Sequence, residues 1–437
     1  MTTTDATRTG PTTASAADTA RVLGLVLAPV VAQGVIARRP RVVGAAARLG
    51  LDARGVRELQ RLRERYGTGP VRLPIPGRPM ALVLDPPDVR RVLEGTPVPF
   101  AADSWEKRGA LRQLQPHGVL ISPPGLRAER RRFNEAVLDT GHPMHRYADA
   151  IARVVREETA PLADRDVLDW DGFITAWWRI VRRVVLGDGA RDDHALTDDL
   201  RRLRQAGNWS WLAPRRRRRY ARVRDGLRRH VERADPGSLA ELVAALPAGP
   251  DVDRLDQVPQ WLFAYDPAGM ATFRALALLA AHPAELDRAR AEVTDPAAPQ
   301  DLPRLRAAVL ESVRLWPTTP LILRDAAEAT DWDGATLPAG TGMVVPAWFL
   351  HRDDRTRADA HRFHPEQWLD GSAFDDPALV PFSAGPAVCP GRELVLFTAA
   401  TFLAVLLRDR TARPPFPADR PLPANLSPFT LRIPLTR

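Results

Sequence analysis

Apolar side chains recur at three- and four-residue spacing along most of this chain, which is the pattern of helices with a buried face. Such spacing predicts helices over residues 51–66, 88–93, 127–138, 147–155, 170–185, 197–206, 215–233, 239–246, 259–281 and 394–407. Short apolar runs bounded by glycine and proline predict strands at 71–74, 80–84, 321–324 and 342–345. The predicted fold is therefore mainly α with a minor antiparallel β region.

The pattern predicts one large domain. The chain has 437 residues, of which 45% are hydrophobic and 26% charged, the composition of a soluble protein with a sizeable core. Turn clusters are the longest breaks between the predicted elements, so we assign residues 21–437 to a single domain. Residues 1–20, rich in Thr, Ala and Asp, lack the positive cluster of a secretory signal and are expected to be a disordered tail.

Residues 23–36 form an apolar stretch that raises the question of a membrane. It has 14 residues and is interrupted by Pro29 and Gln33, whereas a helix that spans a bilayer needs about 18–20 apolar residues. We therefore expect no transmembrane span. A packed helix at the edge of the domain is the favoured interpretation, and a contact with a membrane surface is the alternative.

The charge pattern argues against nucleic acid. Lys and Arg number 62 against 53 Asp and Glu, a net charge of +9, and Lys107 is the only lysine. Acidic residues are interspersed almost throughout, so an acidic protein is at least as good a partner. The arginine run 215–219 is interpreted as a solvated helix face, and Trp209 and Trp211 before it are candidates for the lining of an apolar cavity.

The single cysteine, Cys389, excludes an internal disulfide and a zinc site built on several cysteines, and it fits a reducing cytoplasm. Its loop contains two glycines and two prolines and leads into the predicted helix 394–407. A thiol at a helix entrance meets the positive end of the helix dipole, which favours a thiolate and a soft metal. An inert core thiol is the alternative for a lone cysteine.

Three segments of the C-terminal half resemble the cytochromes P-450, the haem-thiolate monooxygenases. The segments read Phe382-x-x-Gly385-x-x-x-Cys389-x-Gly391, Glu311-x-x-Arg314 and Ala268-Gly269-x-x-Thr272. Their order and spacing match the family, and the weaker helical pattern extends the resemblance back to about residue 51. The resemblance implies the cytochrome P-450 fold and haem b as cofactor.

The resemblance also implies a role for each motif. Cys389 is the proximal thiolate ligand of the haem iron, and Phe382, Gly385 and Gly391 shape the cofactor loop. Glu311 and Arg314 form a structural ion pair, and small Ala268 and Gly269 leave room for O2 beside Thr272, which hydrogen-bonds the activated oxygen.

The haem propionates require cations, and the arginine fork matches a carboxylate. The resemblance assigns this role to Arg130 and Arg324. The register of Arg130 is ambiguous, because Arg127, Arg131 and Arg132 share its helix.

The chain departs from the family at several further positions. Leu126 stands where His or Trp is usual, Ala387 where Arg or His is usual, and Gln367 where an arginine normally completes the Glu–Arg pair. Ala271 replaces the acid that relays protons beside Thr272. Asp266 lies six residues before Thr272 and so on a different helix face, and Pro267 is expected to kink the helix.

The expected function is a cytoplasmic monooxygenase that inserts one oxygen atom of O2 into an apolar organic substrate, with a secondary metabolite as one candidate class. No flavin or iron–sulfur segment is recognised, so a ferredoxin or flavodoxin with its reductase is the expected electron donor, with Arg392 at the docking surface. The alternatives are a peroxide-driven or otherwise atypical oxidase, prompted by Ala271, and a haem-binding sensor without turnover.

Overall fold

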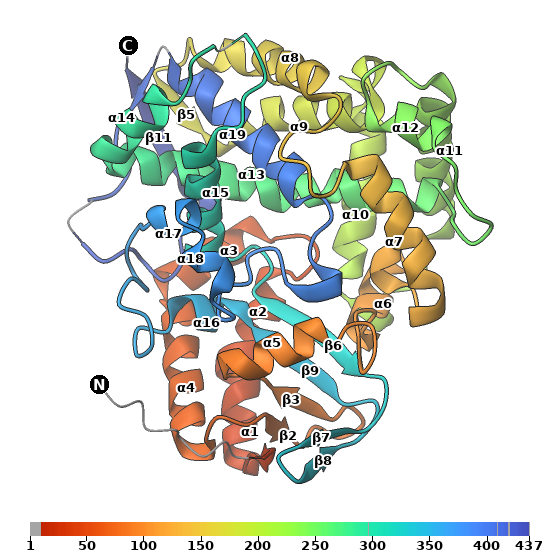
Figure 1. Cartoon of the computed structure of the whole chain (residues 1–437), viewed down its shortest axis with the longest axis vertical. Coiled ribbons are helices and arrows are strands. Elements are labelled where there is room, and N and C mark those ends of the chain that lie inside the picture. Colours follow the sequence, from red (N-terminus) through yellow and green to blue (C-terminus); the bar gives the residue numbers. More distant parts are fainter. Residues whose placement is uncertain (1–9, 296, 409, 418–419, 437) are drawn as a thin grey trace.

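The long segment at the centre of the fold is apolar on every side. In the computed structural model, which describes residues 10–295, 297–408, 410–417 and 420–436, this segment is helix α13 (Val258–Ala281). A helix that is hydrophobic all round is buried all round. Figure 1 shows α13 crossing the helical part of the molecule, and it packs against α9 (Trp170–Leu186), α15 (Pro303–Leu315) and α19 (Arg392–Arg408).

The other helices surround this centre or accompany the sheet. They are α1 (Ala16–Val22), α2 (Ala28–Gln33), α3 (Pro40–Arg48), α4 (Leu51–Tyr66), α5 (Pro86–Glu94), α6 (Trp105–Leu111), α7 (Pro124–Leu138), α8 (Ala148–Thr159), α10 (His194–Gly207), α11 (Arg217–Arg233), α12 (Leu239–Ala245), α14 (Pro283–Ala291), α16 (Ala347–Arg352), α17 (Glu366–Leu369) and α18 (Ser372–Asp375). The predicted helices therefore all form, with boundaries that differ by a few residues.

The main sheet has six strands in the order β1-β2-β3-β9-β6-β4. The strands are β1 (Thr12–Thr13), β2 (Val71–Leu73), β3 (Met80–Leu82), β4 (Phe100–Ala101), β6 (Leu321–Ala326) and β9 (Gly342–Pro346). Smaller sheets contain β5 (Val167–Asp169), β10 (Thr411–Ala412) and β11 (Arg432–Thr436), and the hairpin of β7 (Thr330–Trp332) and β8 (Ala335–Leu337). Most pairs are antiparallel as predicted, but β1–β2 and β3–β9 are parallel.

Two apolar clusters form the core. The larger lies among the helices around α9, α13 and α19, and the smaller joins the main sheet to α1, α4 and α5. In Figure 1 the sheet and the N-terminal helices occupy the lower part, and the helical core the upper part. The mainly helical fold with a minor β region is thus confirmed.

The expected disordered tail does not extend to residue 20. Residues 1–9 lie outside the described residues, but Thr12 and Thr13 pair with β2 and helix α1 begins at Ala16. The Ser15 side chain caps this helix by accepting a hydrogen bond from the Asp18 amide. Composition alone missed this order because it depends on an N-cap serine and on pairing with the distant strand β2.

The apolar stretch at 23–36 belongs to a longer helical segment than we expected. Residues 16–33 are continuously helical, with a π-turn at Leu23–Leu27, and by length and composition alone they could cross a membrane. Val22, Val26 and Val30 recur every fourth residue and are buried, and the segment packs on α4. One face of the helix is therefore core, as the favoured interpretation requires.

Trp209 and Trp211 do not line an apolar cavity, which corrects the prediction. They flank and join the 3₁₀ turn Ser210–Leu212 after α10, and Trp209 is 59% exposed. The Trp211 indole N–H donates to the Trp105 carbonyl, and Arg112 stacks on the Trp211 ring. The Trp209 ring packs on Arg39, and the Trp211 ring packs on Arg112 and Trp105.

Candidate functional site

The cysteine loop is held in shape by its own backbone. The Cys389 amide donates to the Phe382 carbonyl at 2.9 Å, and the Val388 amide donates to the Gly385 carbonyl at 2.9 Å. Gly385 has a φ of +63°, and a Cβ there would lie 2.3 Å from the Leu93 carbonyl oxygen at the end of α5. Only glycine satisfies both the left-handed backbone and this close approach.

The surroundings of the sulfur act in two directions. Burial raises the pKa of the Cys389 thiol, whereas the Gly391 amide and the charges of Arg131 and Arg392 lower it. Burial prevails, so the helix entrance alone does not produce the thiolate that we expected. A bound metal ion would reverse this balance, because a coordinating thiol loses its proton. Arg131 also donates to the Val388 carbonyl at 2.6 Å, which fixes α7 against the loop.

The motif on α13 is buried beside α9. The Thr272 hydroxyl donates to the Ala268 carbonyl at 2.9 Å. A Cβ at Gly269 would lie 2.8 Å from Trp177 Nε1, whose N–H donates to the Tyr265 carbonyl at 2.7 Å. Close packing of the indole therefore requires the glycine.

The positions around Thr272 hold no free carboxylate on α13. Ala271 presents only its carbonyl, which accepts a hydrogen bond from Ser312 at 2.8 Å. Asp266, the single acid of this helix, is paired with Arg204 of α10 at 2.7 Å. Asp266 is thus engaged away from Thr272, as the helical angle predicts.

Glu311 and Arg314 lie together at the centre of a buried network on α15. Arg314 donates to both Glu311 oxygens, at 2.7 and 2.8 Å, and both side chains are fully buried. Burial opposes the guanidinium charge, but the Glu311 carboxylate outweighs it and raises the pKa of Arg314. Further donors to Glu311 are the His364 amide and the Trp368 indole.

Gln367 joins this network in place of the arginine usual in the family. Its amide nitrogen donates to Glu311 at 2.9 Å, and its oxygen accepts from Arg357 at 2.9 Å. The second cation of the network is therefore Arg357, which binds Glu311 through Gln367 and not directly. Sequence analysis missed Arg357, because nothing in its local pattern points to Glu311.

Three cations gather beside the cysteine loop, and they are not the expected pair. Arg324 donates to Thr96 and to Ser383 of the cysteine loop, and both Arg324 and Lys107 donate to the Leu323 carbonyl. Burial, with repulsion from Arg127, lowers the pKa of Arg324 to about 10. Burial, with repulsion from Arg324 and Arg127, lowers the pKa of Lys107 well below its ordinary value.

Arg130 lies outside this cluster. It donates to the Asp251 carbonyl and to the Ser122 hydroxyl, at 2.9 and 2.8 Å. The α7 arginine that belongs to this cluster is therefore Arg127 and not the predicted Arg130. Packing against other segments, which the sequence does not show, decides which side chain of α7 lies near Arg324. Lys107 was missed as well, although its status as the only lysine could have drawn attention to it.

Comparison with known proteins places this site in a family. The family model described as Cytochrome P450 matches residues 264–430. The chain is 34% identical over 175 residues to cyclooctat-9-en-7-ol 5-monooxygenase of Streptomyces melanosporofaciens, covering 38% of each chain. It is 34% identical over 144 residues to sugiol synthase of Salvia miltiorrhiza, covering 30% of this chain and 29% of that one.

The solved structures extend the likeness to the whole fold. Retinoic acid-bound cyanobacterial CYP120A1 matches with a TM-score of 0.69 over 86% of this chain and 93% of that one, at 17% identity. The chain belongs to the cytochrome P450 superfamily. Its sequence matches span only about a third of the curated relatives' length, whereas this P450 shares the fold of CYP120A1 over most of its length.

The residues of this P450 fit haem b, the cofactor of the family, on two observations. Cys389 is the only cysteine, and it lies in the loop that Arg324 contacts through Ser383. Within the described chain, none of the three cations Arg324, Arg127 and Lys107 forms an ion pair with a carboxylate. Two acids attract Lys107 from further away, but each is already bound by another arginine: Asp103 by Arg108 and Asp325 by Arg78. Buried cations without partners are costly, and two propionates would neutralise them.

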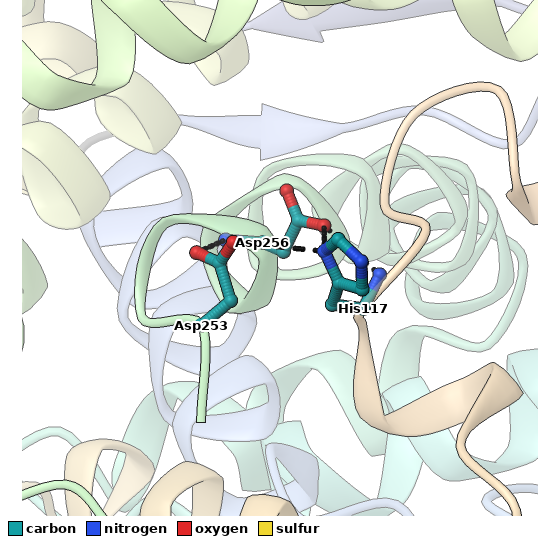
Figure 2. A group of neighbouring side chains, drawn as sticks. All are labelled: His117, Asp253 and Asp256. Carbon is teal, nitrogen blue, oxygen red and sulfur yellow. Dashed lines mark hydrogen bonds and ion pairs between the residues drawn. The ribbon is translucent and has the colours of Figure 1, made fainter. Parts of the chain in front are cut away.

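A second cluster of potential metal ligands lies outside this site. His117 Nδ1 is 3.0 Å from Asp256 and 3.6 Å from Asp253, as Figure 2 shows. Both carboxylates already accept hydrogen bonds from Arg224, and Asp256 accepts another from Tyr220 at 2.5 Å. These bonds tie the loop before α7 to the start of α13, so we assign the cluster a structural role and no metal.

Proposed function

We propose that this P450 is a haem-thiolate monooxygenase that inserts one atom of O2 into an apolar organic substrate. The reaction converts R–H, O2, two electrons and two protons into R–OH and water. The observation that carries the proposal is the half-buried cysteine loop, contacted by Arg324, with the uncompensated cations Lys107 and Arg127 beside that arginine. When bound, haem b would supply an iron that activates O2.

The residues of this chain hold the cofactor from two sides. Cys389 binds the iron as a thiolate, and the Gly391 amide, Arg131 and Arg392 stabilise the negative sulfur. Arg324 and Lys107, with Arg127, hold the propionates. Glu311 and Arg314 keep α15 attached to the 359–368 segment that precedes the loop, and so position the loop indirectly.

Thr272 holds a proton at Oγ1, which donates to the Ala268 carbonyl and would become available for transfer if that bond opened. Ala271 offers no acid behind it, so protons must come from water or from the substrate. We therefore expect the yield of oxidised product per electron to depend on polar groups of the substrate. Uniformly high coupling across substrates with and without hydroxyl groups would contradict this.

The electron donor is proposed to be a separate ferredoxin or flavodoxin with its reductase, in the cytoplasm. Arg392, half-buried beside the cysteine loop, and Arg131 provide positive charge on that side for an acidic partner. The electron-transfer rate should fall as ionic strength rises. A rate independent of salt would remove the electrostatic part of the proposal.

Relatives named as cyclooctat-9-en-7-ol 5-monooxygenase and methyltetrahydroprotoberberine 14-monooxygenase support an organic substrate. The deciding experiment is the spectrum of the reduced protein with carbon monoxide, for wild type and Cys389→Ser. A red-shifted Soret band in wild type that disappears in the variant is expected. A wild type that binds no haem, or shows the band of a neutral ligand, would overturn the proposal.

Ala271 favours one second candidate, a peroxide-driven oxidase. Hydrogen peroxide brings its own protons and electrons, so R–H and H2O2 give R–OH and water without the missing acid. Turnover with peroxide alone, at the rate of the system reconstituted with a redox partner, would support this candidate. A peroxide rate far below the reconstituted rate would exclude it.

A further inference from the structure

A cavity of about 480 Å³ lies apart from the residues assigned to haem and oxygen. It opens to the surface and is lined by α2, α3, α4, α13, α16 and the loops after α15 and before β11. Neither Cys389 nor Thr272 nor Arg324 lines it. The volume falls within the range of about 300–1,000 Å³ that is usual for small-molecule sites.

Three arginines line this cavity with no carboxylate bound to them: Arg274 and Arg352 are buried, and Arg38 is half-buried. Arg274 donates to the Leu426 and Trp316 carbonyls, and Arg38 donates to the Thr318 carbonyl. Arg352 donates to backbone carbonyls and to His361. Among the described residues none of the three arginines forms an ion pair.

The three arginines differ from the fully buried Arg314, which is bound to Glu311. Burial, with repulsion from Arg38, lowers the pKa of Arg274 to about 9. Burial, with repulsion from Arg314, lowers the pKa of Arg352 to about 9. A guanidinium satisfied only by neutral carbonyls keeps its net charge in a poorly solvated place, which favours binding of an anion.

The two acids of the cavity wall do not supply that anion. Asp52 is held by Asn425 at 2.6 Å and by Gln33, and it attracts Arg38 and Arg274 without forming an ion pair with either; burial outweighs these influences and raises the pKa of Asp52. Asp354 is exposed and bound by Gln60. The lining also includes Arg57 and Arg355, both exposed, so positive charge predominates from the rim inward.

The rest of the wall is apolar. Val30, Val56, Met270, Trp316 and Phe429 contribute hydrocarbon surface. Trp348, which is 9% exposed, has an indole N–H that is buried without an acceptor. An occupant of this cavity would therefore combine an anionic group with an apolar body.

We propose that this cavity binds an amphipathic organic carboxylate, with the carboxylate between Arg38 and Arg274 and the hydrocarbon against the apolar wall. The inference goes beyond the proposed monooxygenase function, because no lining residue has a part in that function. The carboxylate can be a substrate whose tail reaches the iron, or an effector that does not.

The test uses the purified full-length haem protein with sodium octanoate and, as a neutral analogue, octanamide. Calorimetric titration at fixed ionic strength should show octanoate binding and at least tenfold weaker octanamide binding. Arg38→Gln and Arg274→Gln should each weaken octanoate binding about tenfold or more, since a charge-assisted hydrogen bond is lost. Arg215→Gln, an exposed arginine outside the cavity lining, should leave binding unchanged.

The comparison of octanoate with octanamide uses the wild-type protein, so it tests the site even if Arg274→Gln fails to fold. Equal binding of octanoate and octanamide, no octanoate binding, or wild-type affinity in Arg38→Gln would overturn it. Where octanoate binds as expected, a simultaneous change of the haem spin state identifies a substrate, and an unchanged haem spectrum identifies an effector site. A protein without thiolate-bound haem that still binds octanoate would separate this site from the proposed function.

Discussion

Lys107 offers a direct test of how the cofactor is held. The ammonium is buried and repelled by Arg324 and Arg127, while it donates to the Ala102 and Leu323 carbonyls. Replacing it with methionine removes the charge and keeps the approximate length. The cofactor-free protein should gain stability, because the repulsion and the cost of burying the charge both disappear.

The same substitution should weaken haem binding. A hydrogen bond between an ammonium and a carboxylate contributes about 1.5–3 kcal/mol, which corresponds to a fall in affinity of about tenfold to a hundredfold. Transfer of haem to an excess of a scavenging protein measures that affinity, and thermal unfolding of the cofactor-free protein measures the stability. Lys107→Arg should retain most of the affinity, and Arg132→Gln, an exposed cation of the neighbouring α7, should change neither quantity.

Because Lys107 is the only lysine, its environment can also be followed chemically. Acetylation of the amine, located by peptide mass, should be fast without haem and slow with haem. Equal acetylation rates in the two forms would refute the assignment of Lys107 to a propionate. So would a Lys107→Met protein with wild-type haem affinity and an unchanged unfolding midpoint.

Three other predictions concern the scaffold. Gly385→Ala should lower the free energy of unfolding of the cofactor-free protein by at least about 2 kcal/mol, measured by denaturant unfolding. At Gly391 the nearest atom to an added Cβ would be 3.8 Å away, so Gly391→Ala should cost less than about 1 kcal/mol. Glu311→Ala should cost about 3–5 kcal/mol and abolish haem loading, since Arg314 is left buried and unpaired; normal haem content would contradict this. Burial, with repulsion from Arg314 and Arg357, lowers the pKa of His351 to about 3. Between about pH 6.5 and 3 only the unfolded chain binds this proton, so the free energy of unfolding should fall by up to about 1.4 kcal/mol for each pH unit of acidification. A His351→Gln protein with the same pH dependence would refute this prediction.

The sequence predicted the elements that carry strong local signals. The all-round apolar segment of α13 and the glycine-rich cysteine loop formed where expected, because their patterns depend on nearby residues alone. The phase of α7 could not be predicted in the same way. Arginines at 127, 130, 131 and 132 are equivalent as sequence, and contacts with distant segments decide which one reaches Arg324.

The contributions of Lys107 and Arg357 could not be predicted for a related reason. Lys107 reaches the carbonyl of Leu323 across 216 positions of the chain. Arg357 replaces an expected cation through the intervening Gln367, a substitution that is visible only when both partners are placed in space. The order at residues 12–22 depends on pairing with β2, which the local composition does not show.

The parallel pairing of β3 with β9 brings residues 80–82 beside residues 342–344 at the middle of the main sheet. Leu93 contacts Gly385 across nearly 300 positions of the chain, so the cysteine loop packs against a segment that is synthesised much earlier. The segment 264–430 that matches the family model therefore lacks both β3 and Leu93, against which it packs. We expect an excised fragment of residues 264–430 to be less stable than the same segment in the whole chain, because it lacks these contacts. On the ribosome, the site for the cofactor can close only after nearly the entire chain has emerged, so long-range assembly, slow by nature, precedes haem capture.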